Sequence, residues 1–130
     1  MGNSKISGWK ASRKARKQHL YRALAPLHLR HKLISANLSK ELRKKYNRRN
    51  LSLRKGDVVR IMVGKFRNSK GKITEVNCQN LKIYIENIMR KKSDGSNVPI
   101  PIDPSNVQII EPAIQDKKRI KILERKNIPK

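Results

Sequence analysis

The sequence is poor in acidic residues. Its 130 residues include 9 Asp+Glu against 33 Lys+Arg, so the formal net charge is +24. A compact protein that carries so much charge of one sign repels itself, unless a polyanion supplies the missing negative charge. The composition therefore indicates nucleic acid as the partner, with an anionic membrane surface as the alternative.

Cysteine and long apolar runs are also scarce. The single cysteine, Cys78, excludes a disulfide framework and suits a reducing compartment. No apolar run approaches the ~20 residues that span a bilayer, and residues 1–10 contain no apolar core of signal-peptide length. We therefore expect a cytoplasmic protein with no membrane partner.

Groupings of catalytic residues are missing as well. The few acids are scattered, with no paired carboxylates and no Ser/His/Asp or Cys/His grouping. His28 and His31 have an H-x-x-H spacing, but zinc needs two further ligands and the one cysteine is far away in sequence. We expect no enzyme activity, no metal, no cofactor and no small-molecule substrate.

Hydrophobic residues make up 36% of the sequence, which is low for a fully packed chain of this length. One small core of about 60 residues with basic arms is the arrangement that this supports. We expect a basic extension with two short helices at residues 1–50, a small barrel at residues 51–112, and a basic helical tail at residues 113–130.

The clearest β pattern lies at residues 53–76. Apolar and other side chains alternate from Val59 to Val63, which predicts a strand with one buried face. The loop at residues 64–71 has Gly at both ends and Asn68 near its middle, and we expect a sharp turn because these residues tolerate positive φ. Phe66 in this loop either covers the end of the barrel or stacks on a base.

Further short strands follow. Alternation at residues 81–85, a strand at 88–92, an Asp94-Gly95 hairpin turn and a closing strand at 107–110 are expected. Residues 98–101 contain two prolines, which lack ladder donors and so predict an edge strand or irregular chain. Ile73 and Val76 break the alternation, which indicates a bulge. The fold class is mainly β, with a small SH3-like barrel.

Three helices are expected around these strands. Ser12 is the predicted N-cap of a helix at residues 13–24, and residues 26–38 read as a connector. Ser39 is expected to cap a second helix that ends at Asn47. A charged helix is expected at residues 116–126.

The central stretch resembles a known motif. Gly56-Asp57, then V-R-I-M, then Gly64, then Gly71-Lys72-Ile73 are similar to the KOW motif of ribosomal proteins and transcription elongation factors. Asn68 stands where that motif has a Gly, and we expect the turn to survive because Asn tolerates the left-handed conformation.

The resemblance extends over roughly residues 12–125. APLHLRHKLISANLSKELRKKYNRRNLSLRKGD at residues 25–57, and DGSNVPIPIDPSNVQII at residues 94–110, resemble one large-subunit ribosomal protein family. This family is numbered twenty-four in bacteria and archaea and twenty-six in eukaryotes. The long basic segment before the barrel is of the archaeal or eukaryotic type, and the short tail favours an archaeal source.

The resemblance implies a structural component of the large ribosomal subunit. Such a protein binds the 5′-terminal domain of large-subunit rRNA early in assembly, contacts neighbouring ribosomal proteins and lies near the polypeptide exit tunnel. A KOW-type transcription elongation factor, or another nucleic-acid-binding protein, is the alternative.

Basic side chains distributed over the extension and the barrel are the predicted RNA contacts, because Lys and Arg neutralise phosphates and release counterions. They are Arg13, Lys14, Arg16, Lys17, Arg22, His28, Arg30, His31, Lys32, Arg43, Arg48, Arg49, Arg54, Lys55, Arg60, Lys65, Arg67, Lys70, Lys72 and Arg90.

Overall fold

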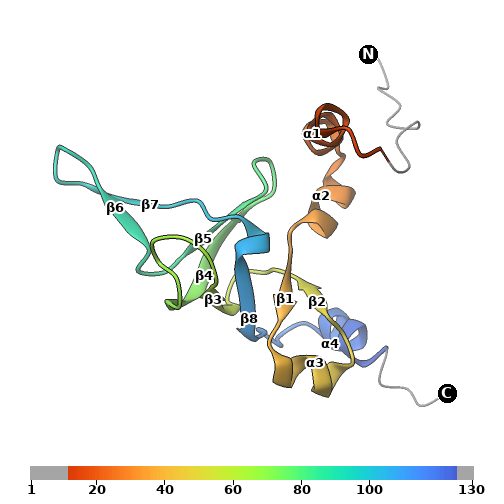
Figure 1. Ribbon diagram of the computed structural model, residues 1–130. Coiled ribbons are helices and arrows are strands. Elements are labelled where there is room, and N and C mark those ends of the chain that lie inside the picture. The colour runs from red at the N-terminus through yellow and green to blue at the C-terminus, as the bar shows by residue number, and fades with distance from the viewer. Residues whose placement is uncertain (1–11, 126–130) are drawn as a thin grey trace.

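The structure, a computed structural model, describes residues 12–125. Helices lie at both ends of this range and strands occupy its middle (Figure 1). The elements, in order, are α1 (Ala15–Leu24), α2 (Leu27–Leu33), β1 (Ser35–Leu38), α3 (Lys40–Tyr46), β2 (Asn50–Ser52), β3 (Val58–Ile61), β4 (Lys70–Asn77), β5 (Lys82–Ile85), β6 (Met89–Lys91), β7 (Asn97–Pro99), the 3-10 helix η1 (Pro104–Asn106), β8 (Val107–Glu111) and α4 (Lys117–Glu124).

Six of the strands form one sheet, in the order β2-β1-β8-β3-β4-β5. Every neighbouring pair is antiparallel except β1 and β8, which are parallel. The other two strands, β6 and β7, form a separate antiparallel hairpin that projects from the sheet (Figure 1). The prediction of a mainly β protein with helices at both ends is thus confirmed within the described range.

The closed barrel that the sequence predicts is not confirmed, because the sheet stays open between its end strands β2 and β5. An isolated bridge joins Ile83 of β5 to Ile102, and the chain then returns through η1 to β8. One edge of β8 pairs with β3, and β1 occupies the other edge at Gln108 and Ile109. The strand β1, which precedes the predicted barrel, therefore occupies the edge of β8 that a closed barrel would pair with β5.

The hydrophobic core draws on both ends of the described chain as well as on its middle. Ala36 and Leu38 of β1 are buried together with Val59 of β3, Ile109 of β8 and Leu123 of α4. Burial of β3, β5 and β8 alternates residue by residue, as expected for strands with one face on the core. The strand β1 and the helix α4 are therefore parts of the same packed unit as the central strands.

Residues 26–38 are not the connector that the sequence predicted, because they form α2 and β1. Ile34, Ala36 and Leu38 are buried in alternation, which is the pattern of a strand against a core. The alternation covers too few residues to be distinguished from a connector in the sequence. Pairing with β2 and β8 stabilises β1.

Two of the predicted helix signals are confirmed. The Ser39 hydroxyl accepts a hydrogen bond from the Leu42 N–H (3.4 Å), and Asn47 ends α3 in the left-handed conformation with φ 48°. The predicted cap at Ser12 is wrong, because α1 begins at Ala15 with Lys14 at its N-cap. Ser12 instead accepts a bond from the Lys14 N–H (3.3 Å), two residues on, as is typical of serine in turns.

The predicted bulge and hairpin turn are present. The pairing of β4 with β5 shifts register between Ile73 and Glu75. At the tip of the β6–β7 hairpin, Gly95 has φ 89° and the Asp94 carboxylate accepts bonds from the N–H and hydroxyl of Ser96. The hydrogen bond from the Ser96 hydroxyl is the main reason that the pKa of the Asp94 carboxyl lies below its ordinary value.

Candidate nucleic-acid interface

The helix α1 presents the basic side chains of Arg16, Lys17 and Arg22 at exposed positions. It buries no residue, and it has no acid in its sequence to balance its cations. A polyanion beside α1 supplies the negative charge that this helix lacks and so stabilises it. The predicted contacts on and just before α1 are all exposed, namely Arg13, Lys14, Arg16, Lys17 and Arg22.

The loop between β3 and β4 turns sharply, as the sequence predicted. Gly64 has φ 99° and Asn68 has φ 68°, so Asn takes the left-handed position at which the KOW motif has a Gly. The Asn68 N–H donates to the Ile61 carbonyl (2.8 Å), which fixes the base of the loop. Phe66 packs against the core, and this favours the covering role over base stacking.

Two of the predicted contacts, Lys65 and Arg67, lie in this loop, and a third, Lys70, is the first residue of β4; all three are exposed. The Arg67 N–H donates to the Gly64 carbonyl (3.1 Å), and the Ser69 N–H donates to the Phe66 carbonyl (3.1 Å). Because the backbone is tied in this way, binding orders less chain than it would in an unsupported loop.

Gly71 does not have the positive φ that the sequence suggested, and its role is spatial. It lies in β4 opposite Val59. A Cβ atom at this position would lie 2.5 Å from Ile85 Cγ2 and 3.0 Å from the backbone oxygen of Glu86. Glycine is therefore needed here because β5 and the turn after it lie so close.

Several predicted RNA contacts hold the protein itself together. The Arg30 guanidinium donates to the carbonyl oxygens of Ala25 (2.8 Å), Ala23 (2.7 Å) and Gln79 (2.9 Å), which ties α1 and α2 to the turn before β5. Arg43 donates to the Leu38 carbonyl (2.8 Å). These contacts leave each guanidinium fewer donors for a phosphate.

Three further arginines bond within the described chain. Arg60 donates to the Gln108 side-chain oxygen (2.9 Å), and Arg48 donates to the Ile122 carbonyl (2.5 Å). Arg54 forms an exposed ion pair with Asp116 (2.6 Å). This hydrogen bond is the main reason that the pKa of the Asp116 carboxyl lies below its ordinary value.

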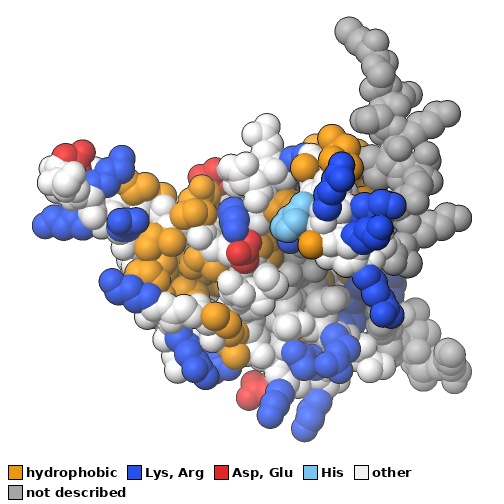
Figure 2. All heavy atoms as spheres, turned by 45° about the horizontal axis from the view of Figure 1, so that its top comes forward, with side chains coloured by type: hydrophobic (Ala, Val, Ile, Leu, Met, Phe, Trp, Pro, Cys, Tyr) orange, Lys and Arg blue, Asp and Glu red, His pale blue; other side chains and the backbone are white. Residues whose placement is uncertain are grey.

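The remaining predicted contacts are exposed, and they are His28, His31, Lys32, Arg49, Lys55, Lys72 and Arg90. Figure 2 shows Lys and Arg side chains on the hairpin at the left and around the helices at the right, with few acidic side chains between them. The predicted residues thus lie over several elements and do not converge on one cleft.

The histidines do not form a metal site within the part of the chain that the structure describes. His31 Nδ1 lies 3.7 Å from the sulfur of Cys78, and His28 is exposed without a comparable neighbour. No group of three or more His, Cys, Asp or Glu residues suited to a metal ion occurs among residues 12–125.

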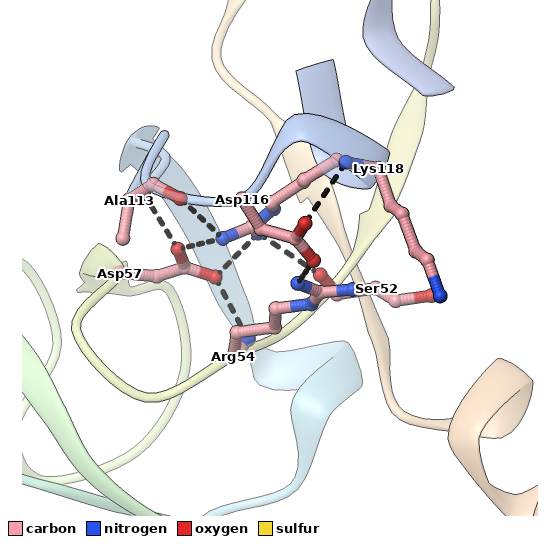
Figure 3. A network of polar contacts seen from close by, with 7 residues as sticks. Ser52, Arg54, Asp57, Ala113, Asp116 and Lys118 are labelled. Carbon is pink, nitrogen blue, oxygen red and sulfur yellow. Dashed lines mark hydrogen bonds and ion pairs between the residues drawn. The ribbon is translucent and has the colours of Figure 1, made fainter. Parts of the chain in front are cut away.

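A buried ion pair between Asp57 and Arg119 was missed from the sequence. Asp57 is 0% and Arg119 is 2% exposed, and the guanidinium contacts both carboxylate oxygens, at 2.5 Å and 2.7 Å. Figure 3 shows Asp57, Ser52 and Ala113 gathered around this contact. The one available signal was helical spacing, because Arg119 lies four residues before the apolar Leu123 and so shares its face.

Backbone groups complete the network around the pair. The carboxylate of Asp57 accepts bonds from the N–H groups of Arg54 (2.9 Å) and Ala113 (2.8 Å). The guanidinium of Arg119 donates to the carbonyls of Ser52 (3.1 Å) and Ala113 (3.1 Å). This arrangement fastens α4 to the turn before β3, and with it the basic C-terminal segment to the sheet.

No helix within residues 12–125 is long and apolar enough to cross a bilayer. A small sheet that carries basic helices and a tightly turned basic loop is typical of proteins that bind nucleic acid. The sequence comparisons narrow that class.

A family model described as "Ribosomal proteins L26 eukaryotic, L24P archaeal" matches residues 10–126. A curated archaeal relative, "Large ribosomal subunit protein uL24" of Korarchaeum cryptofilum (strain OPF8), is 41% identical over 117 residues, which cover 90% of this chain and 89% of the relative. The chain therefore belongs to this family of large-subunit ribosomal proteins, and the resemblance seen in the sequence is confirmed. Members of the family are structural components of the ribosome and not enzymes.

Proposed function

We propose that this protein binds the 5′-terminal domain of large-subunit rRNA early in assembly, in the cytoplasm, beside neighbouring ribosomal proteins and near the polypeptide exit tunnel. The observation that carries the RNA-binding part is the exposed, acid-free α1. A helix that buries nothing and carries cations with no acid of its own gains from a partner that neutralises its charge.

In this proposal the basic arms and the β3–β4 loop contribute differently to RNA binding. The basic arms neutralise crowded phosphates and release counterions, which contributes affinity without sequence preference. The β3–β4 loop is tied at its base and holds Lys65, Arg67 and Lys70 exposed. A preformed loop of this kind suits a groove or junction in folded RNA, because shape and backbone contacts dominate the recognition of structured RNA.

We expect affinity for a fragment of the 5′-terminal rRNA domain to fall steeply with salt. If about eight phosphates are neutralised, a plot of log K against log salt has a slope of about −6 to −7, at ~0.7 to 0.9 per phosphate. Filter binding or fluorescence anisotropy at several salt concentrations measures this slope. A slope near zero contradicts an electrostatic interface and with it the proposed function.

The loop is tested separately by replacing Lys65, Arg67 and Lys70 together with alanine. We expect the affinity for the rRNA fragment to fall about tenfold or more, because several charge-assisted contacts are lost. The melting temperature should change little, since all three side chains are exposed. Unchanged affinity in this variant means that the loop faces solvent and that the contact lies elsewhere on the protein.

A further inference from the structure

A small basic pocket lies between the β1–β2 edge of the sheet and α4. Its volume is about 190 Å³. A water molecule's share of liquid volume is about 30 Å³, so the pocket admits a group of several heavy atoms. Its charged lining residues are all cations, namely Lys32, Arg48, Arg54 and Arg119.

The charge of this pocket is only partly balanced. Arg119 is paired with Asp57, and Arg54 is paired with Asp116. Lys32 has no acidic partner among residues 12–125, and Arg48 donates to a neutral carbonyl, that of Ile122. Two positive charges are therefore left over at a half-enclosed site, which favours an anion.

Neutral polar groups suited to an oxyanion complete the lining. Ser35, Asn50 and Ser52 all border the pocket, and they supply hydroxyl and amide groups that can donate hydrogen bonds. Arg119 itself has both Nη atoms engaged with Asp57, Ser52 and Ala113, so it forms part of the pocket wall and adds no free charge.

We infer that this pocket binds a single phosphate group, and that in the ribosome the group is a phosphodiester of the rRNA backbone. The inference rests on the proposed function, because it assigns one rRNA phosphate to a defined site. Residues from α2, β1, β2 and α4 line the pocket, so the bound phosphate joins the N-terminal segment to the C-terminal helix. Backbone contacts of this kind position a protein on nucleic acid.

The experiment that tests this inference places a negative charge in the pocket of the full-length protein. Asn50→Asp changes the size of the side chain hardly at all and adds a repulsive carboxylate beside the site. Asn97→Asp, on the exposed strand β7 and outside the pocket, is the control with the same change in net charge. Lys32→Gln removes a pocket cation, and Lys44→Gln on α3 is its control because Lys44 is exposed and lies outside the pocket.

Affinity for the rRNA fragment is then measured against salt for all five proteins. We expect Asn50→Asp to bind about tenfold more weakly than Asn97→Asp, with a salt slope shallower by about 0.7 to 0.9, the value for one phosphate. Lys32→Gln should shift affinity and slope in the same direction relative to Lys44→Gln. Pocket variants that match their controls overturn the inference.

Two further outcomes are distinguishable. If the wild-type protein itself shows no salt-dependent binding, the proposed function fails. If the wild-type slope is steep and the pocket variants match their controls, only the pocket assignment fails. Thermal melting in sodium phosphate against sodium chloride at equal ionic strength tests the source of the phosphate. A stabilisation by phosphate that Asn50→Asp loses, with RNA affinity and slope unchanged, shows a site for free phosphate and overturns the rRNA assignment.

Discussion

Arg119→Ala is expected to lower the free energy of unfolding by about 3 to 5 kcal/mol. The reason is that truncation leaves the Asp57 carboxylate buried without its counter-ion, which costs far more than the intact pair contributes. Asp57 is 0% exposed in the intact protein, so the guanidinium of Arg119, and not water, compensates its charge. Urea denaturation followed by circular dichroism measures the loss as a shift in midpoint.

Three further variants separate the effect of the buried charge from that of the helix that carries it. Lys118→Ala, at the next position of α4 but exposed, should change stability by no more than about 0.5 kcal/mol. Arg119→Met leaves the carboxylate unpaired, and adding Asp57→Asn to it removes that charge, so the double variant should be more stable than Arg119→Met alone. A double variant that is less stable than the single one contradicts this explanation.

Gly71→Val is expected to destabilise the protein by about 3 kcal/mol, because a side chain at this position meets β5. Even a Cβ atom lies 2.5 Å from Ile85 Cγ2, and the Glu86 backbone oxygen, at 3.0 Å, has little freedom to move. Valine adds two methyl groups to that overlap. For a domain of this size we expect the melting temperature to fall by about 10 °C or more, as measured by calorimetry.

Gly64→Ala is the matched comparison, since Gly64 has φ 99° but nothing within 4 Å of an added Cβ atom. Alanine there should cost about 1 kcal/mol, from backbone strain alone. Position 71 has the opposite properties, because its φ is not in the left-handed region but an added Cβ atom has no space. Gly71→Ala therefore tests crowding without backbone strain. If Gly64→Ala proves more damaging than Gly71→Val, then backbone conformation and not crowding governs this loop.

Local signals in the sequence predicted the elements whose cause lies within a few residues. Ser39 and Asn47 bound α3 because capping is a local hydrogen bond or a local φ. Gly95 and Asp94 form the hairpin turn for a similar reason. Alternation of apolar residues located β3 and β5 because each packs one face on the core.

Features that depend on distant partners were missed. The strand β1 is four residues long, and only its pairing with β2 and β8 distinguishes it from a connector. Arg119 is one of several basic residues in α4, and its burial depends on Asp57, 62 residues earlier in the chain. The open edge of the sheet follows from the same pairing of β1, so closure could not be decided from the strand pattern alone.

The sequence indicates which residues are basic, but not which of them are free to contact RNA. The exposed cations of α1 and of the β3–β4 loop lie where the sequence placed them. Arg30 and Arg43, in contrast, donate to carbonyl groups of this chain, and no sequence pattern separates such an arginine from one that faces RNA. The small pocket beside α4 was not foreseen, because its lining comes from residues 32–54 and 119–122.

The order of strands in the sheet has a consequence for how the chain is made. β8 lies between β1 and β3, yet it is the last strand to be synthesised. Until it emerges, β1–β2 and β3–β4–β5 are two separate pieces with unpaired edges, and pairs this far apart in sequence form slowly. The native sheet is therefore complete only after β8 has been synthesised, and until then both pieces keep an unpaired edge.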